Sequence, residues 1–186
     1  HTRPYTYTGR TLDFYCHPGA GAGQSSIYRS DGTYLKTALA LCDVGIITWH
    51  GKYTFNLERP ETYIRRVMKT DWSPLHDNPS FPSYPSGHSA FSAAAAEVLT
   101  AQLGEHFTLT DRTHENRQEF TGKPRTYHSF TEMAQENATS RVLLGVHYRM
   151  DCIEGLRLGK SVGQKANALP LKRVEAKLST RITDNE

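Results

Sequence analysis

The chain has 186 residues and a mass of 20.9 kDa, with 37% hydrophobic and 22% charged residues. This composition excludes a collagen-like, low-complexity or wholly disordered chain, and the length fits one domain of ordinary size. The net charge of +3 comes without a long basic run, and no apolar stretch is long enough for a transmembrane helix, so we expect neither nucleic-acid binding nor membrane insertion.

The sequence divides into an extended N-terminal arm, residues 1–33, and a helical-bundle domain, residues 34–186. The arm is polar and rich in turn-forming residues, and its Gly-Ala repeat lacks the ending of a phosphate-binding loop. The first helix is expected over residues 34–57, where apolar residues recur at helical spacing on most sides, as in a buried helix. Pro60 restricts the backbone of Arg59 and is expected to end this helix.

Shorter elements follow in the middle of the chain. Residues 61–69 predict a short helix, and four prolines within residues 70–85 predict an extended loop. A further helix is expected from about Ser86 to Gly104, because serine suits an N-cap and glycine a C-cap. Its four consecutive alanines, residues 93–96, allow close approach of a neighbouring helix.

The last part of the chain is again mostly helical. Residues 105–128 are polar and predict a loop, with a short hairpin as an alternative. Ser129 suits an N-cap, and Glu132 completes a capping box. The helices expected from there cover residues 130–144, residues 151–167 and a charged tail after Pro170. The cysteines, Cys16, Cys42 and Cys152, allow at most one internal disulfide, and their spacings are not typical of a zinc site.

Two basic residues, Lys52 and Arg59, lie seven positions apart in the first predicted helix, so both side chains should share one face. Taken alone, such a pair usually belongs to a solvated surface. The helix is otherwise apolar, however, and buried cations need an anionic partner. The pair therefore indicates either a charged surface or part of an anion site.

The segment Pro85-Ser86-Gly87-His88 forms the second candidate. Ser86 can cap a helix, and Gly87 lets the backbone come close to a ligand. The amides at the start of this helix, together with its dipole, can cradle an oxyanion. His88 lies in the first turn and could exchange a proton with the bound group. The alternative is an ordinary capped helix start.

The third candidate contains Arg141, His147 and Asp151, with Gly145 turning the chain between the first two. His147 precedes Asp151 by four residues, so in a helix or turn the carboxylate can accept a hydrogen bond from one imidazole nitrogen. That bond would select the tautomer and leave the other nitrogen free as a nucleophile or metal ligand. A purely structural His–Asp pair is the alternative.

Taken together, these segments indicate one site for a tetrahedral oxyanion, and their order is highly specific. The chain resembles the superfamily that joins vanadium-dependent haloperoxidases with the phosphatidic-acid-phosphatase-type acid phosphatases, over residues 52–151. The resemblance implies an all-α bundle of the haloperoxidase and acid-phosphatase type, in which residues 34–186 are the catalytic domain. Because such haloperoxidases are longer, we expect the C-terminal part of a larger helical protein, completed by an N-terminal chain of the same precursor or by a partner.

The resemblance also assigns roles to individual residues. Those expected to hold the oxygens of vanadate or phosphate are Lys52, Arg59, Ser86, Gly87, His88 and Arg141. His88 would be the acid–base residue, assisted by Lys52. His147 would bind vanadium in a haloperoxidase, or form a phosphohistidine in a phosphatase, and Asp151 would orient it.

The surroundings of the motifs favour the haloperoxidases. The segments around Trp49, Phe81 and residues 127–136 are similar to theirs, and Trp49 and Phe81 would be aromatic walls of a halide pocket, with core packing as the alternative. We therefore expect a vanadate-dependent enzyme that oxidises halide with hydrogen peroxide to hypohalous acid, which then reacts with a small organic acceptor. The alternatives are a soluble acid phosphatase and a non-catalytic anion-binding module. By resemblance, the protein would be secreted or periplasmic, and it could form homo-oligomers.

Overall fold

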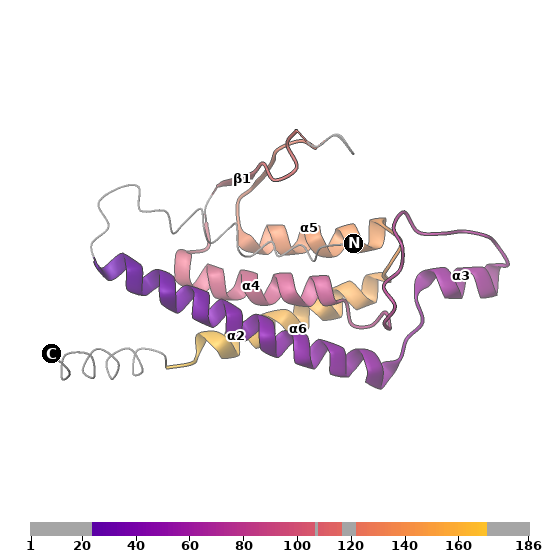
Figure 1. The fold of residues 1–186 in the computed structure, drawn as a ribbon, viewed down its shortest axis with the longest axis horizontal. Helices are drawn as coiled ribbons and strands as arrows, with labels where there is room; N and C mark the ends of the chain where they lie inside the picture. The colour runs from indigo at the N-terminus through magenta and orange to yellow at the C-terminus, as the bar shows by residue number, and fades with distance from the viewer. Residues whose placement is uncertain (1–23, 107, 117–121, 171–186) are drawn as a thin grey trace.

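The longest element is α2 (Gln24–Phe55), which crosses the bundle diagonally in the computed structural model (Figure 1). The structure describes residues 24–106, 108–116 and 122–170. The extended arm predicted for residues 1–33 was wrong over residues 24–33, which are helical, and its remainder lies outside the described residues. Polar residues are compatible with a helix, and extending an existing helix costs far less than starting one.

The end of α2 separates the two cations that were expected on one helical face. The helix stops at Phe55, and Asn56 adopts a left-handed conformation with φ of 45°, which asparagine tolerates. Arg59 then has an extended backbone, as expected before Pro60. The prediction of a shared helical face was therefore wrong, because Arg59 is the N-cap of the next helix, α3 (Pro60–Met68).

The proline-rich loop leads into α4 (Gly87–Leu103), whose predicted ends are confirmed. The side chain of Ser86 is the N-cap and accepts a hydrogen bond from the backbone N–H of Ser89 at 3.4 Å. Gly104 is the C-cap, with φ of 104°, a conformation that favours glycine. Both ends follow from local chemistry, so the sequence was sufficient to place them.

A short hairpin precedes the last two helices. Strand β1 (Leu109–Asp111) pairs antiparallel with β2 (Arg125–Tyr127), so the alternative of a hairpin within the predicted loop is confirmed. In α5 (Phe130–Leu143), the N-cap Ser129 accepts from the N–H of Glu132 at 3.0 Å. The tail helix predicted after Pro170 lies outside the described residues.

Helix α4 is the centre of the bundle, with α5 on one side and α2 and α6 (Arg149–Asn167) on the others (Figure 1). Its closest partner is α6, which presents glycines at every fourth position to it. These are Gly155, Gly159 and Gly163. A Cβ added to Gly159 would lie 2.1 Å from the carbonyl oxygen of Ala90. The lack of a side chain at these three glycines therefore allows the short distance between α4 and α6.

The outer side of α2 carries large apolar residues without a partner among the described residues. Leu35, Ile46 and Tyr53 are 49%, 70% and 64% exposed, whereas the side facing α4 contains small buried residues such as Ala40 and Val44. None of the helices in the described ranges is both long and apolar enough to cross a membrane.

The two described cysteines are free thiols. Cys42 is exposed on α2 and Cys152 is buried in α6. Cys16 lies outside the described residues, so the expectation of at most one internal disulfide stays untested.

Candidate oxyanion site

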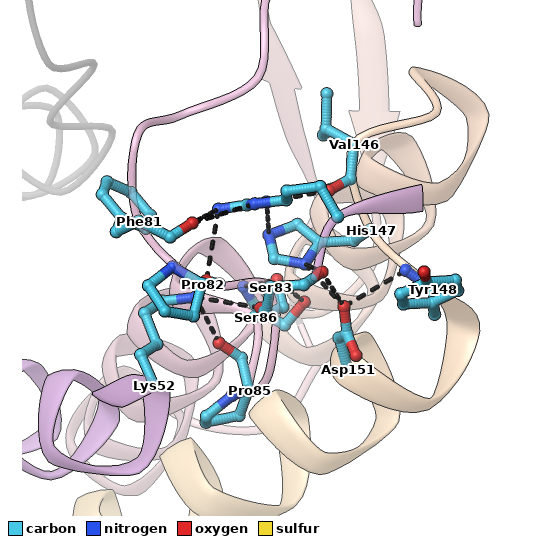
Figure 2. A network of polar contacts seen from close by, with 12 residues as sticks. Lys52, Phe81, Pro82, Ser83, Pro85, Ser86, Val146, His147, Tyr148 and Asp151 are labelled. Carbon is cyan, nitrogen blue, oxygen red and sulfur yellow. Dashed lines mark hydrogen bonds and ion pairs between the residues drawn. The ribbon is translucent and has the colours of Figure 1, made fainter. Parts of the chain in front are cut away.

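The predicted site residues meet at one end of the bundle, where α4 and α6 begin. Figure 2 shows Lys52, Ser86, His147 and Asp151 there. Lys52 comes from the last turn of α2, and Arg59 from the segment before α3. Arg141 lies in the last turn of α5, and His147 follows in the turn before α6. Segments far apart in the sequence therefore converge, as the oxyanion interpretation requires.

Lys52 is completely buried, and its ammonium group is held by the proline-rich loop. Its Nζ atom donates to the backbone carbonyl oxygens of Pro82 at 2.9 Å, Ser83 at 3.0 Å and Pro85 at 2.7 Å. Burial and the neighbouring Arg59 lower the pKa of Lys52 to about 7, while Asp151 acts in the opposite direction. The loop thus fixes a cation at the start of α4.

Arg59 is also buried, and its guanidinium joins the loop to the turn before α6. Its Nε and Nη2 atoms donate to the carbonyl of Phe81 at 3.1 and 3.0 Å, and Nη1 donates to that of Val146 at 2.8 Å. Nη1 also lies 3.1 Å from Nε2 of His147. Burial lowers the pKa of Arg59 to about 10.

The hydrogen bond predicted between His147 and Asp151 is present, with 2.9 Å between Nδ1 and Oδ2. A guanidinium can only donate, so Nε2 of His147 accepts from Arg59 and carries a lone pair. The ring proton is therefore on Nδ1, and the ring is neutral. Burial lowers the pKa of His147 to about 4, although the bond to Asp151 opposes this shift. Nε2 was expected to be free, but the neighbouring guanidinium contacts it.

Arg141 and His88 complete the group of cations and imidazoles. The Nε atom of Arg141 is buried and has no hydrogen-bond partner among the described residues. His88 is exposed in the first turn of α4, yet desolvation by its surroundings, followed by the charge of Arg141, lowers its pKa to about 4. His147, Lys52 and Arg59 lower it further, which places His88 among the same charges.

The start of α4 is the segment expected to cradle an oxyanion. Ser86 and Gly87 are buried, and the backbone N–H of Ser86 donates to the carbonyl of Asp151 at 3.0 Å. The hydroxyl of Ser89 donates to that of Ser86 at 3.0 Å. The first amides of a helix have no acceptor within the helix. Because those of Ser86 and Ser89 are already bonded, the N–H groups of Gly87 and His88 are the ones that could donate to an anion.

Trp49 and Phe81 form an aromatic wall beside the cradle. Their ring centroids are 5.0 Å apart, and the ammonium of Lys52 lies 5.1 Å from the Phe81 centroid. A Cβ on Gly87 would lie 3.5 Å from the Trp49 ring. Trp49 is 36% exposed, so its ring is partly open to solvent.

The charges around this site do not balance. Arg59 and Arg141 are fully charged and Lys52, with a pKa of about 7, is partly charged at neutral pH, whereas Asp151 is the only carboxylate that acts on Lys52 or Arg59 within the described ranges. Buried cations in excess favour an anionic ligand, and the unpartnered Arg141 Nε is a donor available to one. The residues present therefore fit an oxyanion such as vanadate or phosphate.

Sequence reasoning missed Ser83, which is fully buried in the proline-rich loop. Its hydroxyl donates to Oδ2 of Asp151 at 2.5 Å and lies 3.3 Å from Nδ1 of His147 (Figure 2). Ser83 belongs to none of the three motifs, and its partners are more than sixty positions away. Its position between Pro82 and Pro85 was the one signal that a loop residue could be held rigidly.

The two imidazoles make the stability of the fold sensitive to acid. Their pKa values are about 4 in the folded chain and 6.5 ordinarily, so between these values the unfolded chain binds more protons. The free energy of unfolding should therefore fall as the pH falls from about 6.5 to about 4, with no contribution above that window. Urea denaturation across this range would measure it, and His88→Gln should flatten part of the slope. An identical slope in this variant would contradict the prediction.

Comparisons with known proteins find vanadium-dependent haloperoxidases among the similar chains. The vanadium-dependent bromoperoxidase of Ascophyllum nodosum is 34% identical over 54% of this chain and 19% of its own length, and the vanadium chloroperoxidase of Curvularia inaequalis is 28% identical over 61% and 26%. The structure of a bacterial vanadium-dependent iodoperoxidase matches with 36% identity and a TM-score of 0.68, over 74% of this chain and 33% of that one. A bacterial vanadium-dependent chloroperoxidase, at 24% identity and a TM-score of 0.61, shares the fold.

A protein-family model described as the VCPO second helical-bundle domain matches residues 33–175. The match covers most of the chain and includes every predicted site residue. The all-α bundle expected from the resemblance is confirmed, although the chain spans only a fraction of the length of these relatives. The chain belongs to the vanadium-dependent haloperoxidase family and corresponds to its second helical-bundle domain.

Proposed function

We propose that this site binds vanadate and, in the whole protein, oxidises halide with hydrogen peroxide to hypohalous acid. The observation that carries the proposal is the excess of buried positive charge around a neutral His147. The ring is held by Asp151, and its Nε2 lone pair faces the guanidinium of Arg59. An oxyanion that occupied the site would satisfy the cations, and its central atom would find a nitrogen ligand in Nε2.

Each residue of the site would have a separate role. Lys52, Arg59 and Arg141 would offset the charge of the bound anion and draw electron density from it. His88, neutral at ordinary pH, could accept a proton and return it at the edge of the cradle. Asp151 would keep the proton of His147 on Nδ1, so that the Nε2 lone pair, which accepts from Arg59 in this structure, would bind the ligand in place of that contact. Bound vanadate supplies Lewis acidity that activates peroxide toward halide.

The same Nε2 lone pair also suits a second function. A neutral, oriented imidazole among cations is what a phosphohistidine-forming acid phosphatase requires of its nucleophile. In that reaction His147 would attack phosphorus, and His88 would protonate the leaving group. A third possibility is a module that binds anions without catalysis.

One set of assays separates these functions. The protein is assayed for bromide and iodide oxidation by hydrogen peroxide, with and without orthovanadate, and in parallel for hydrolysis of a phosphomonoester. Oxidation that depends on vanadate is expected. Hydrolysis that vanadate inhibits would replace the proposal with the phosphatase, and neither activity in the complete protein would leave only anion binding.

We also propose that Trp49 and Phe81 line the halide site, because both rings lie beside Lys52. Trp49→Ala should raise the KM for halide more than it lowers the affinity for vanadate. The reason is that the Trp49 ring makes no hydrogen bond to the side chains that are expected to hold the vanadate oxygens. Steady-state kinetics at saturating vanadate, beside vanadate titration, would measure the two effects. Tyr53→Ala, which removes a 64% exposed aromatic ring from the outer side of the same helix, is the control. Unchanged halide KM in Trp49→Ala would remove this assignment.

The expectation of a larger helical protein stays a prediction, as does a homo-oligomer. The structural support for a larger protein is the apolar outer side of α2, where Ile46 and Tyr53 are exposed to solvent in the described part of the chain. We propose that another helix of the same precursor covers it. The mass of the native protein tests this, since a chain of only 20.9 kDa with full activity would contradict it.

A further inference from the structure

Ser83 connects the proline-rich loop, which holds Lys52, with the imidazole of His147. Its backbone carbonyl accepts from Lys52, and its backbone N–H donates to the carbonyl of Leu57 at 2.9 Å. Its side chain turns the other way, toward His147 and Asp151 (Figure 2). Ser83, which belongs to none of the three motifs, therefore contacts both Lys52 and the His147–Asp151 pair.

The direction of each hydrogen bond follows from the atoms involved. A carboxylate only accepts, so the single hydroxyl proton of Ser83 goes to Oδ2 of Asp151, at 2.5 Å. The N–H at Nδ1 of His147 then points between Oδ2, at 2.9 Å, and the Ser83 oxygen, at 3.3 Å. These three atoms form a closed triangle, and the backbone N–H of Tyr148 donates to Oδ2 from 3.2 Å.

The second carboxylate oxygen of Asp151, Oδ1, does not help to hold the side chain in place. Oδ1 of Asp151 is buried and has no hydrogen-bond partner in the part of the chain that the structure describes. The orientation of the carboxylate is therefore held entirely through Oδ2. Without the Ser83 hydroxyl, Oδ2 would keep only its bonds to the imidazole it must orient and to one backbone amide.

We propose that Ser83 is a positioning residue, which acts through Asp151 to hold the ring of His147 with Nε2 directed into the site. The inference rests on the proposed function for its consequence, vanadate binding, but the geometry it describes exists in the free protein. Loss of a group that orients a metal-binding histidine typically weakens metal affinity by about 10–100-fold. Ser83→Ala should fall in that range.

The first test is vanadate affinity, measured by equilibrium dialysis with elemental analysis of vanadium. Ser83→Ala should weaken binding by about 10-fold or more. The matched control is Thr37→Val, which removes another buried hydroxyl, bonded to the carbonyl of Thr33, on the order of 20 Å from Lys52 along α2. Its affinity should equal that of the wild type. Equal losses in both variants would mean a merely structural effect and would overturn the proposal.

A double-mutant cycle tests the route of the effect. If Ser83 acts through Asp151, Ser83→Ala should change vanadate affinity little in an Asp151→Ala background, because the acceptor is already gone. The same fold-change in both backgrounds would refute the proposed route.

The second readout needs no vanadate. In the free protein, the Nδ1–H proton of His147 should give an NMR signal that exchanges slowly with water, and Ser83→Ala should speed that exchange while Thr37→Val does not. Unchanged exchange would overturn the role of Ser83 even if vanadate binds. If the wild type binds no vanadate, the proposed function fails, and this exchange measurement still decides the role of Ser83.

Discussion

His147→Ala should abolish the retention of vanadate. The variant removes the Nε2 lone pair that accepts from Arg59, and it leaves Lys52, Arg59 and Arg141 in place. Loss of a residue that merely supports a metal ligand costs about 10–100-fold in affinity, so loss of the ligand itself should exceed about 100-fold. Weak anion binding by the cations should survive, because their charge remains in excess.

The measurement is the vanadium content of the protein after dialysis against vanadate and removal of free ligand. His128→Ala is the matched control, since His128 is exposed and its side chain is not part of the site. Thermal unfolding of both variants checks that the fold remains. Unchanged vanadium content in His147→Ala would disprove the ligand assignment, and with it the role proposed for Asp151.

Gly159→Ala should destabilise the fold strongly. The added Cβ would lie 2.1 Å from the carbonyl oxygen of Ala90, and because this oxygen belongs to the backbone of α4, it cannot rotate away. The helices would have to separate along their whole contact. Overpacking costs about 1–3 kcal/mol, and a clash with a backbone oxygen belongs at the upper end of that range. Less a gain of about 1 kcal/mol in helix propensity, a net loss of about 2 kcal/mol is expected.

Urea denaturation would measure this loss, with Gly45→Ala as the matched control. Gly45 also lies inside a helix, but its added Cβ would meet the ring edge of Phe91 at 3.1 Å, and a side chain can move. Gly45→Ala should therefore change the free energy of unfolding by about 1 kcal/mol or less. Equal effects of the two substitutions would show that the separation of α4 and α6 is not set by the glycines.

The glycines of α6 also affect the position of the proposed site, because one of them lies against the start of α4. A Cβ added to Gly155 would lie 2.5 Å from the carbonyl of Ser86, the N-cap of α4. The cradle amides follow directly after that residue. The close approach of the two helices therefore places the start of α4 against Asp151, whose carbonyl accepts from the N–H of Ser86.

Features that depend on near neighbours in the chain could be predicted from the sequence. Ser86 and Gly104 were recognised as caps because capping uses residues within one turn. The bond between His147 and Asp151 was predictable because the two are four positions apart. The set of site residues came from the resemblance, and the structure brings them together at one end of the bundle.

Features that depend on distant segments could not be predicted in this way. Lys52 and Arg59 were expected together for the wrong reason, since Asn56 ends the helix between them and the loop carbonyls, rather than a helical face, hold both cations. The contact of Arg59 with Nε2 of His147 joins residues 88 positions apart. No spacing or periodicity encodes such a pair, because it exists only once the helices have packed.

By itself, the sequence determined which side chains could form an oxyanion site, where most helices begin and end, and to which family the chain belongs. Only the tertiary structure decided that Ser83 supports Asp151, that Arg59 contacts the ring of His147, and how closely α6 approaches α4. The physical reason is range. Caps and short-range hydrogen bonds act within a turn of helix, whereas the site is built by backbone carbonyls and side chains that packing alone brings together.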